Sequence, residues 1–376
     1  MPPKIGIKAM SKKEKYKICL VGECLSLGGA EKTMALLSRF FAANGIAVHT
    51  VIVVDSVAYS YSGELLNLGK LKNKSNGIFN KLRRFVVLKK YLRDNRFDYI
   101  IDFRIRTSFL QEYLISKWLY QLPTVYTVHS AMTDLYFPGS AWQARAIYKN
   151  AYGLVAVSDA IEAIIKTKYD LSNTKTIHNP VAIDEISNSH DTFLPRDYQY
   201  IMAAGRMKID VKQFDRLIEA YAQSELPQKG IRLVILGDGE KRSGLEKLAA
   251  DLGLQQMVVF EGHVENPYSH MKNALFFVLS SKKEGFPLVI LETLACGIPV
   301  VSFDCISGPS EMIVDRQNGL LIADQDFGKL IEAMNLFIAD EALYRHCRQN
   351  AKESARQFSL ENIGRQWLAF LKINVS

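Results

Sequence analysis

The chain has 376 residues, of which 48% are hydrophobic and 23% are charged. These values exclude disordered, collagen-like and disulfide-scaffold proteins, and no apolar run reaches the ~18 residues that a membrane-spanning helix needs. The net charge of +8 is uneven, because residues 1–180 carry +13 and residues 181–376 carry −5. This asymmetry favours two domains with different partners, the basic one facing nucleic acid, anionic lipid or a phosphorylated substrate.

The cysteines and the N-terminal leader indicate the compartment. The five cysteines are scattered and form no C-x-x-C pair, which is typical of reduced thiols in a cytoplasm. Residues 1–17 are rich in lysine but lack the apolar core of a secretory signal, so we interpret them as a loose basic tail. We therefore expect a cytoplasmic protein.

Short β-branched runs alternate with helical patterns such as residues 31–44 and 215–224. This alternation predicts parallel sheets covered by helices on both faces. The series occurs twice, and the polar stretch at about residues 184–198 separates the two copies. We expect an α/β protein of two doubly wound, Rossmann-like domains facing across a cleft at the carboxyl ends of their strands. The predicted strands span residues 17–22, 48–54, 99–103, 124–129, 153–158, 200–205, 231–237, 257–261, 275–281, 300–304 and 320–322.

Two features of the first half lie where strands end. Between the first strand and the first helix, residues 21–31 contain Gly28 and Gly29, which let backbone approach a phosphate or sugar closely. This loop matches neither G-x-x-x-x-G-K-[ST] nor G-x-G-x-x-G, so the signal is weak.

His129 closes a predicted strand at the expected cleft. A single histidine is more often structural, but this position makes it a candidate for contacting a transferred group.

The second half offers two cations at the end of its first strand. Arg206 follows the strand directly and Lys212 comes six residues later. Together they could hold a diphosphate and stabilise the charge that grows as it leaves. Taken alone, the pair would more often be two solvated surface cations.

The most informative window is residues 280–299, SSKKEGFPLVILETLACGIP. It predicts a strand end, a loop, and a helix that starts near Pro287 and stops at Gly297. Glu284 lies in the loop and Glu292 on the helix. A carboxylate, a helix N-terminus and a second carboxylate would match sugar hydroxyls, a diphosphate and ribose hydroxyls in that order. The D-x-D at Asp324 and Asp326 has no other ligands nearby, so we expect a solvated turn and no metal site.

Several segments, in one order along the chain, resemble the family-4 (group 1) retaining glycosyltransferases, which have the GT-B fold. The Glu-x7-Glu spacing of EGFPLVILE is a hallmark of that family. The resemblance implies transfer of a sugar from a nucleotide donor, with retention at the anomeric carbon and no cofactor or metal. The matching segments are GGAEKTMALLSRFFAANG, VAVSDA, HNPVAID, GRMKIDVKQFD, LVILGDGEKRSGLE, FEGHVENPY, the 280–299 window and SGPSEMIVDRQNGLLI.

The resemblance also implies roles for particular residues. Arg206 and Lys212 would bind the diphosphate, Glu284 the donor sugar and Glu292 the ribose. Backbone amides around Gly285, Phe286 and Leu288 would help to hold the diphosphate and sugar. Gly28 and Gly29 would approach the donor from the first domain, and His129 would face the anomeric centre. Reaction on one face of the sugar, without a protein nucleophile, fits a sequence without a nucleophile–base pair.

The resemblance sets the expected domains as well. Residues 1–183 would form the acceptor-side domain and residues 184–357 the donor-binding domain. A C-terminal helix within residues 358–376 would cross back to the first domain. One departure from the family pattern is Gln213, which stands where a glycine usually follows the lysine, so the loop backbone at Lys212 could differ.

Residues 71–106 carry eleven Lys and Arg against three Asp. Phe79, Leu82, Phe85, Val86 and Leu92 interleave with cations there. Two interpretations stand equally. A basic amphipathic helix could rest on the anionic inner face of a membrane, or its apolar face could pack on the sheet while the cations are solvated.

The sequence favours an α-retaining hexosyl- or N-acetylhexosaminyltransferase that uses a UDP sugar and a glycan or lipid-linked saccharide acceptor. Its product would be bacterial surface polysaccharide or lipopolysaccharide. Two alternatives remain: a GT-B-fold sugar-nucleotide epimerase, and a catalytically silent subunit that binds a membrane or partner. The chain has no helix-turn-helix or RNP-like element, so we expect no nucleic acid partner.

Overall fold

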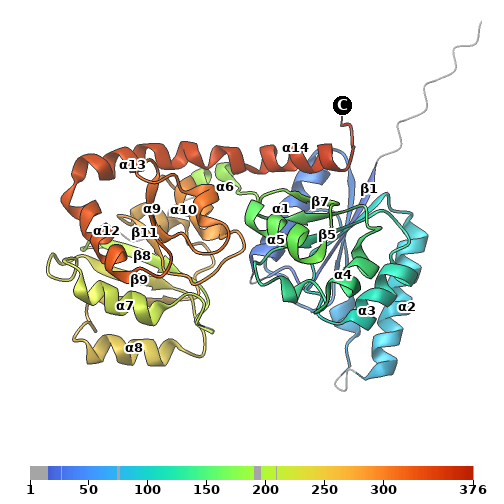
Figure 1. Ribbon diagram of the computed structural model, residues 1–376, viewed down its shortest axis with the longest axis horizontal. Helices are drawn as coiled ribbons and strands as arrows, with labels where there is room; N and C mark the ends of the chain where they lie inside the picture. The colour runs from blue at the N-terminus through green and yellow to red at the C-terminus, as the bar shows by residue number, and fades with distance from the viewer. Residues whose placement is uncertain (1–15, 27, 74–76, 190–195, 209, 376) are drawn as a thin grey trace, which may run out of the picture.

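The computed structural model describes residues 16–26, 28–73, 77–189, 196–208 and 210–375. Most of the predicted basic tail and part of the predicted 184–198 boundary lie outside these residues. The described chain forms two α/β lobes side by side, joined along one edge by a long C-terminal helical segment (Figure 1). None of the helices in these described ranges combines the length and the apolar character needed to cross a bilayer.

The first lobe is built on a seven-stranded sheet in the order β3-β2-β1-β4-β5-β6-β7, with every neighbouring pair parallel. Its order reverses between β1 and β4, which is the switch point where doubly wound sheets bind ligands. The strands are β1 Lys17–Gly22, β2 Ala47–Ile52, β3 Glu64–Asn67, β4 Tyr99–Asp102, β5 Thr124–Val128, β6 Gly153–Ala156 and β7 Thr174–Thr176.

The second lobe has a six-stranded parallel sheet in the order β10-β9-β8-β11-β12-β13. Its order reverses between β8 and β11. The strands are β8 Tyr200–Ala204, β9 Arg232–Leu236, β10 Val258–Gly262, β11 Phe277–Leu279, β12 Val300–Phe303 and β13 Gly319–Ile322. The predicted fold class, two doubly wound α/β domains of the GT-B type, is confirmed.

Helices connect the strands and cover both faces of each sheet. The α-helices are α1 Gly29–Ala43, α2 Ile78–Asn95, α3 Phe109–Leu114, α4 Ala141–Tyr148, α5 Asp159–Tyr169, α6 Ile183–Asn188, α7 Phe214–Gln223, α8 Arg242–Asp251, α9 Tyr268–Asn273, α10 Leu288–Ala295, α11 Pro309–Met312, α12 Phe327–Ala339, α13 Glu341–Ser354 and α14 Leu360–Phe370. Short helical turns are η1 Leu68–Leu71, η2 Ile115–Leu119, η3 Thr133–Leu135 and η4 Arg356–Phe358.

The buried strands formed as their β-branched runs predict, whereas β3 and β7 were not predicted. Both are edge strands of three or four residues with exposed or half-buried polar side chains. Asp326 of the predicted turn caps α12, its side chain accepting from the amide of Lys329 at 2.9 Å.

The C-terminal helix α14 packs against α1 of the first lobe. Gly364 makes the close approach possible, because a Cβ there would lie 2.5 Å from the ring of Phe40. The hydroxyls of Tyr99 and Tyr152 donate to the carbonyls of Leu371 and Phe370 at 2.6 and 3.0 Å. The last helix of the chain is thus anchored on the lobe in which the chain began.

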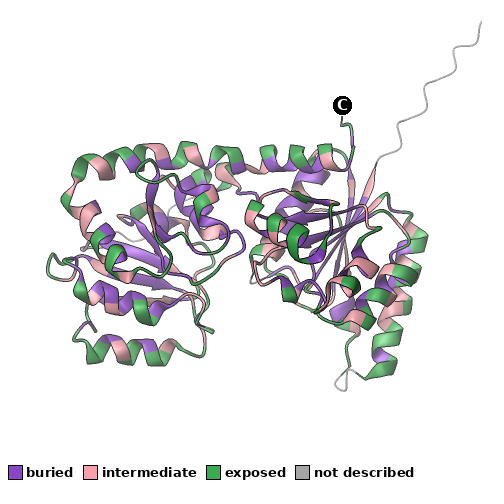
Figure 2. Ribbon diagram, viewed as in Figure 1, coloured by how far each residue is buried: buried purple, intermediate pink, exposed green. Residues whose placement is uncertain are grey.

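Helix α2 carries the basic run, and one side of it packs on the lobe while the other is exposed to solvent (Figure 2). Leu88 and Leu92 are buried, Phe85 is half-buried, and Phe79 remains 85% exposed. Ile78, Leu82 and Val86 are also exposed. The interpretation in which the cations of residues 71–106 are merely solvated does not hold for Arg104 and Arg106, which are buried at the carboxyl end of β4.

Candidate active site

The carboxyl ends of the two sheets meet at the loops that follow β5 and β11. A Cβ on Gly285 would lie 2.0 Å from the carbonyl oxygen of His129, so backbone touches backbone there. The Ala131 amide donates to the Glu284 carbonyl at 3.4 Å. Of the sequence-predicted site residues, the structure thus brings His129, Glu284 and Gly285 together across the two lobes. A cavity of about 420 Å³ between residues 116 and 152 lies elsewhere, at the amino ends of β5 and β6.

Lys212 and Glu284 form an ion pair at this contact. The Lys212 Nζ lies 2.7 Å from Glu284 Oε1, and the two side chains are only 22% and 13% exposed. The loops that carry them are tied together, because Ser280 Oγ donates to the Lys212 carbonyl at 2.8 Å. Because the two loops are hydrogen-bonded to each other, the half-buried pair has a fixed geometry. Its carboxylate could bind a sugar hydroxyl and its ammonium group an anionic phosphate.

The loop after Lys212 keeps its turn despite lacking a glycine. Gln213 adopts φ +49° and ψ +44°, the left-handed conformation that glycine takes without strain, and it begins α7. Its side chain is buried and its Oε1 has no hydrogen-bond partner among the described residues. The absence of the glycine is therefore accommodated by backbone strain at Gln213, which adopts the left-handed conformation.

Replacing Gln213 should separate this backbone strain from side-chain effects. Gln213→Gly is expected to be more stable than Gln213→Ala by about 1 kcal/mol, because both remove the amide and only alanine keeps a Cβ at positive φ. Thermal unfolding midpoints of the two variants and the parent chain measure this difference. An alanine variant as stable as the glycine variant would contradict the prediction.

Arg206 lies exposed just beyond β8. Burial raises the pKa of Glu31, and a hydrogen bond to its own backbone together with the positive charge of Arg206 opposes that rise. Glu31 folds back over Gly28, since a Cβ on Gly28 would lie 2.0 Å from its carboxylate. Gly29 faces the second lobe, because its Cβ would lie 3.5 Å from Leu288 Cδ1. The starts of α1 and α10 therefore oppose each other.

The 280–299 window folds as predicted. Helix α10 starts at Leu288 after Pro287 and ends at Ala295, Cys296 is its C-cap, and Gly297 follows with φ +77°. The Phe286 ring is buried between aromatic neighbours, so only its backbone can face a ligand. Glu292 is buried on α10 and forms an ion pair with Lys32 of the first lobe.

His129 is neutral at physiological pH. Burial, with a further contribution from the positive charge of Arg106, lowers the pKa of His129 to about 3. Its Nε2 lies 3.0 Å from Thr127 Oγ1, and the Thr127 hydroxyl donates to the Asp102 carbonyl. Thr127 therefore accepts from Nε2–H, which leaves His129 Nδ1 as a hydrogen-bond acceptor.

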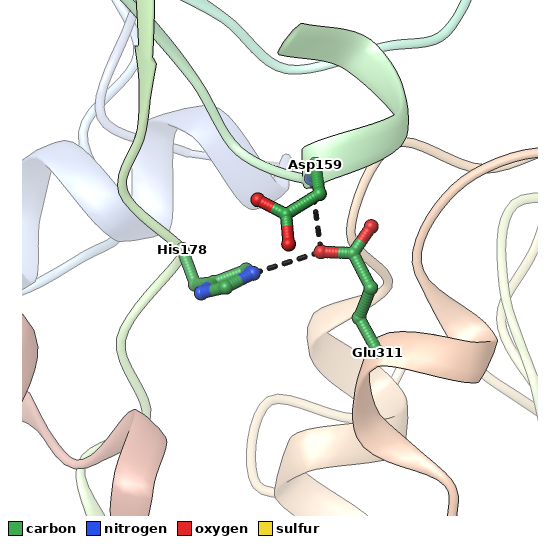
Figure 3. Close-up of side chains that lie close together, drawn as sticks. All are labelled: Asp159, His178 and Glu311. Carbon is green, nitrogen blue, oxygen red and sulfur yellow. Dashed lines mark hydrogen bonds and ion pairs between the residues drawn. The ribbon is translucent and has the colours of Figure 1, made fainter. Parts of the chain in front are cut away.

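A second contact between the lobes gathers His178, Asp159 and Glu311 (Figure 3). Glu311 Oε2 accepts from the Asp159 amide at 3.0 Å and lies 2.8 Å from His178 Nε2. The carboxylate thus sits at the N-terminus of α5, where free amides and the helix dipole favour an anion. One ligand atom from each residue lies within 4.8 Å of the others, a spacing that could hold a cation. The Glu311 oxygens already serve as a cap, and the absence of a metal site stays a prediction.

Glu311→Ala is expected to lower the thermal unfolding midpoint. The change removes an anionic cap of α5 and the partner of His178, an effect of about 1–2 kcal/mol. Glu341→Ala is the matched control, since Glu341 forms an exposed pair with Arg345 on α13 and should change the midpoint little. Equal midpoints for both variants would show that the Glu311 contact contributes nothing to stability.

Two family models match the chain, and they meet between the lobes. The glycosyltransferase family 4 model covers residues 27–185, and the model of the glycosyl transferases group 1 covers residues 184–354. The chain belongs to the group 1 glycosyltransferases. The resemblance drawn from the sequence motifs is confirmed for the group 1 family, and retention at the anomeric carbon stays a prediction.

Relatives of this group 1 chain include bacterial enzymes of glycan synthesis. A Campylobacter jejuni α-1,4-N-acetyl-D-galactosaminyltransferase, named for a GalNAc-containing diNAcBac-PP-undecaprenol, is 25% identical over 94% of this chain and 98% of its own length. An exopolysaccharide phosphotransferase of Streptomyces coelicolor is 36% identical over 43% of this chain. The chain spans 17%, 60% and 52% of the lengths of three curated relatives from Streptomyces coelicolor, Haemophilus influenzae and Campylobacter jejuni.

Solved structures share the fold of this group 1 chain at low identity. A glycosyltransferase of Rickettsia africae superposes with a TM-score of 0.78 at 17% identity, over 96% of this chain and 98% of its own. Anabaena HepE, solved in complex with UDP-glucose, superposes with a TM-score of 0.74 at 20% identity, over 95% and 99%. These superpositions support the GT-B arrangement of the two lobes.

Sequence reasoning missed several residues at these contacts. Lys32 reaches Glu292 from α1, and the charge of Arg206 acts on Glu31. His178 and Glu311 meet between the lobes. All four fall inside segments that carried the family resemblance, so their motifs were visible. Their pairing depends on how the lobes face each other, and the sequence offers no signal for that.

Proposed function

We propose that this chain is a retaining glycosyltransferase of bacterial surface polysaccharide or lipopolysaccharide synthesis. It moves a hexose or N-acetylhexosamine from a nucleotide sugar, in the first place a UDP sugar, to a glycan or lipid-linked saccharide. The observation that carries the proposal is the Lys212–Glu284 ion pair held against His129 of the opposite lobe. The relative named for transfer to an undecaprenol-linked saccharide and the neighbour solved with UDP-glucose support the substrate classes.

The donor would lie between the starts of α1 and α10. Arg206 and Lys212 hold the diphosphate, assisted by backbone amides near Gly285 and Leu288. Glu284 accepts hydrogen bonds from the sugar hydroxyls, and Glu292 accepts them from the ribose. Neutral His129 adds no positive charge next to the anomeric carbon.

The proposed reaction breaks the bond between the anomeric carbon and the diphosphate oxygen. The electron pair leaves with the diphosphate, where Arg206 and Lys212 stabilise it. The acceptor hydroxyl oxygen bonds to the anomeric carbon on the same face, and its proton passes to the departing diphosphate. The nucleotide sugar is a substrate, and the two cations supply the positive charge, so the proposed reaction uses no metal or cofactor.

Transfer from a panel of UDP sugars tests this function. The purified chain is incubated with UDP-glucose, UDP-galactose, UDP-GlcNAc or UDP-GalNAc and an undecaprenyl-diphosphate oligosaccharide, and UDP release and glycolipid product are followed. NMR of the product gives the anomeric configuration. We expect an α-linked product from one donor. A β-linked product would refute retention, and release of no UDP from the four donors would refute the UDP-sugar transferase.

The exposed half of α2 supports a peripheral position on the cytoplasmic face of the membrane. We define the α2 surface as its exposed apolar residues together with the cations between them. These are Ile78, Phe79, Leu82 and Val86 with Lys81, Arg83, Lys89 and Lys90. Bare apolar side chains among cations are the features of helices that lie on anionic bilayers. Such a position would bring the enzyme to a lipid-linked acceptor.

Vesicle binding tests the α2 surface. The chain should cosediment with phosphatidylcholine vesicles containing phosphatidylglycerol at low salt and dissociate as salt rises. The double variant Phe79→Ser/Leu82→Ser should bind about tenfold more weakly, because two apolar side chains no longer enter the bilayer. Val314→Ser removes an exposed valine of the second lobe and is the control. Equal binding by both variants would exclude this surface.

A further inference from the structure

Three side chains meet where α1 of the first lobe faces α10 of the second. Lys32 on α1 forms an ion pair with Oε1 of Glu292, and its Nζ donates to the hydroxyl of Tyr268 at 3.0 Å. Tyr268 begins α9 in the second lobe. Lys32 of the first lobe thus holds the carboxylate of Glu292, the group that binds the ribose in the proposed function.

Lys32 is protonated at physiological pH. Burial alone would lower the pKa of Lys32, but Glu292 and Tyr268 beside it raise that pKa above its usual range. Glu292 is buried and its side chain is 11% exposed. A buried carboxylate with a fixed counter-ion keeps one orientation, whereas a solvated glutamate samples many.

We infer that Lys32 is a positioning residue of the donor site and sets its preference for a ribose over a deoxyribose nucleotide. Lys32, itself bonded to the Tyr268 hydroxyl, fixes Glu292 through Oε1, so that Oε2 is presented to the ribose hydroxyls. The inference rests on the proposed function and extends it, because ribose recognition then depends on the first lobe as well as the second.

A merely structural ion pair would behave differently. If Lys32 only joined the two lobes, its loss would weaken binding of every nucleotide to the same degree. If it orients Glu292, its loss mainly weakens the ligand whose ribose hydroxyls reach that carboxylate. The ratio of the affinities for UDP and 2′-deoxy-UDP therefore separates the two roles.

Calorimetry with UDP and 2′-deoxy-UDP tests the inference. The parent chain should prefer UDP. Lys32→Met, which keeps the apolar stem and removes the charge, should weaken UDP about tenfold and leave 2′-deoxy-UDP nearly unchanged, since a charged hydrogen bond contributes an effect of that order. Lys32→Arg should recover part of the preference. Tyr268→Phe should lose less than Lys32→Met, because the ion pair remains.

Lys329→Met is the matched control, since Lys329 pairs with Glu332 on the surface of α12. Thermal unfolding of each variant establishes that it is folded. A Lys32→Met protein with the parent's preference for UDP, or with equal loss for both nucleotides, would overturn the inference and leave the transferase proposal standing. A parent chain that binds no UDP would overturn the UDP-sugar function and the inference with it.

Discussion

Replacing Glu284 by glutamine is expected to slow sugar transfer by about 10²–10³-fold while the chain stays folded. Glutamine keeps the shape of the side chain but loses the charge that pairs with Lys212 2.7 Å away and that, in the proposed function, binds the sugar hydroxyls. Losing one interaction that strengthens in the transition state typically costs a rate factor of this size. Steady-state transfer from the UDP sugar that the panel identifies measures it.

Glu246→Gln is the control for this prediction, because Glu246 is exposed on α8 and pairs there with Arg242. Its rate should equal that of the parent. If Glu284→Gln also transfers sugar within a few-fold of the parent, Glu284 has no part in the reaction. Lys212→Met provides a second variant of the same ion pair and should lose activity to a similar extent.

Gly285→Ala is expected to reduce kcat/KM by about 100-fold. The added Cβ would come within 2.0 Å of the His129 carbonyl oxygen and 3.1 Å of the Ser130 Cα. Both neighbours are backbone atoms, so no side-chain rotation relieves the clash and the two loops must separate. A displacement of about 1 Å between reacting groups can cost such a factor.

Gly244→Ala is the matched control, because a Cβ on Gly244 in α8 meets no atom within 4 Å. That variant should keep full activity and gain slightly in helix stability. Both proteins are compared by transfer rate and by thermal unfolding. If Gly285→Ala is as active as Gly244→Ala, the contact between the loops after β5 and β11 is not needed for transfer.

The sequence predicts those parts of the fold that rest on local patterns. Each buried strand is a short, mostly apolar run, as is typical of parallel strands that are buried on both faces. The start of α10 after Pro287 and its end before Gly297 follow from capping preferences that need no tertiary contact. The edge strands β3 and β7 escape this reasoning because only part of each faces a core.

The positions of the candidate site residues in the fold were predictable in outline, while their partners were not, and their roles stay predictions. The topology places four candidate residues at the carboxyl edge of the second sheet, because they follow the ends of its strands. These residues are Arg206 and Lys212 after β8, and Glu284 and Glu292 after β11. The pairing of Lys32 with Glu292 joins residues 260 positions apart and depends on how the lobes face each other. Arg104 and Arg106 also show that a run of cations in sequence does not reveal which of them turn inward.

The most direct test of the account is a crystal structure of the chain with UDP bound. We predict density for the diphosphate between Arg206, Lys212 and the Leu288 amide, with the ribose hydroxyls on Glu292 and the Lys32 contact retained. The place of the sugar would then lie between Glu284 and His129. UDP bound away from these residues, or a nucleotide that contacts only one lobe, would contradict the account.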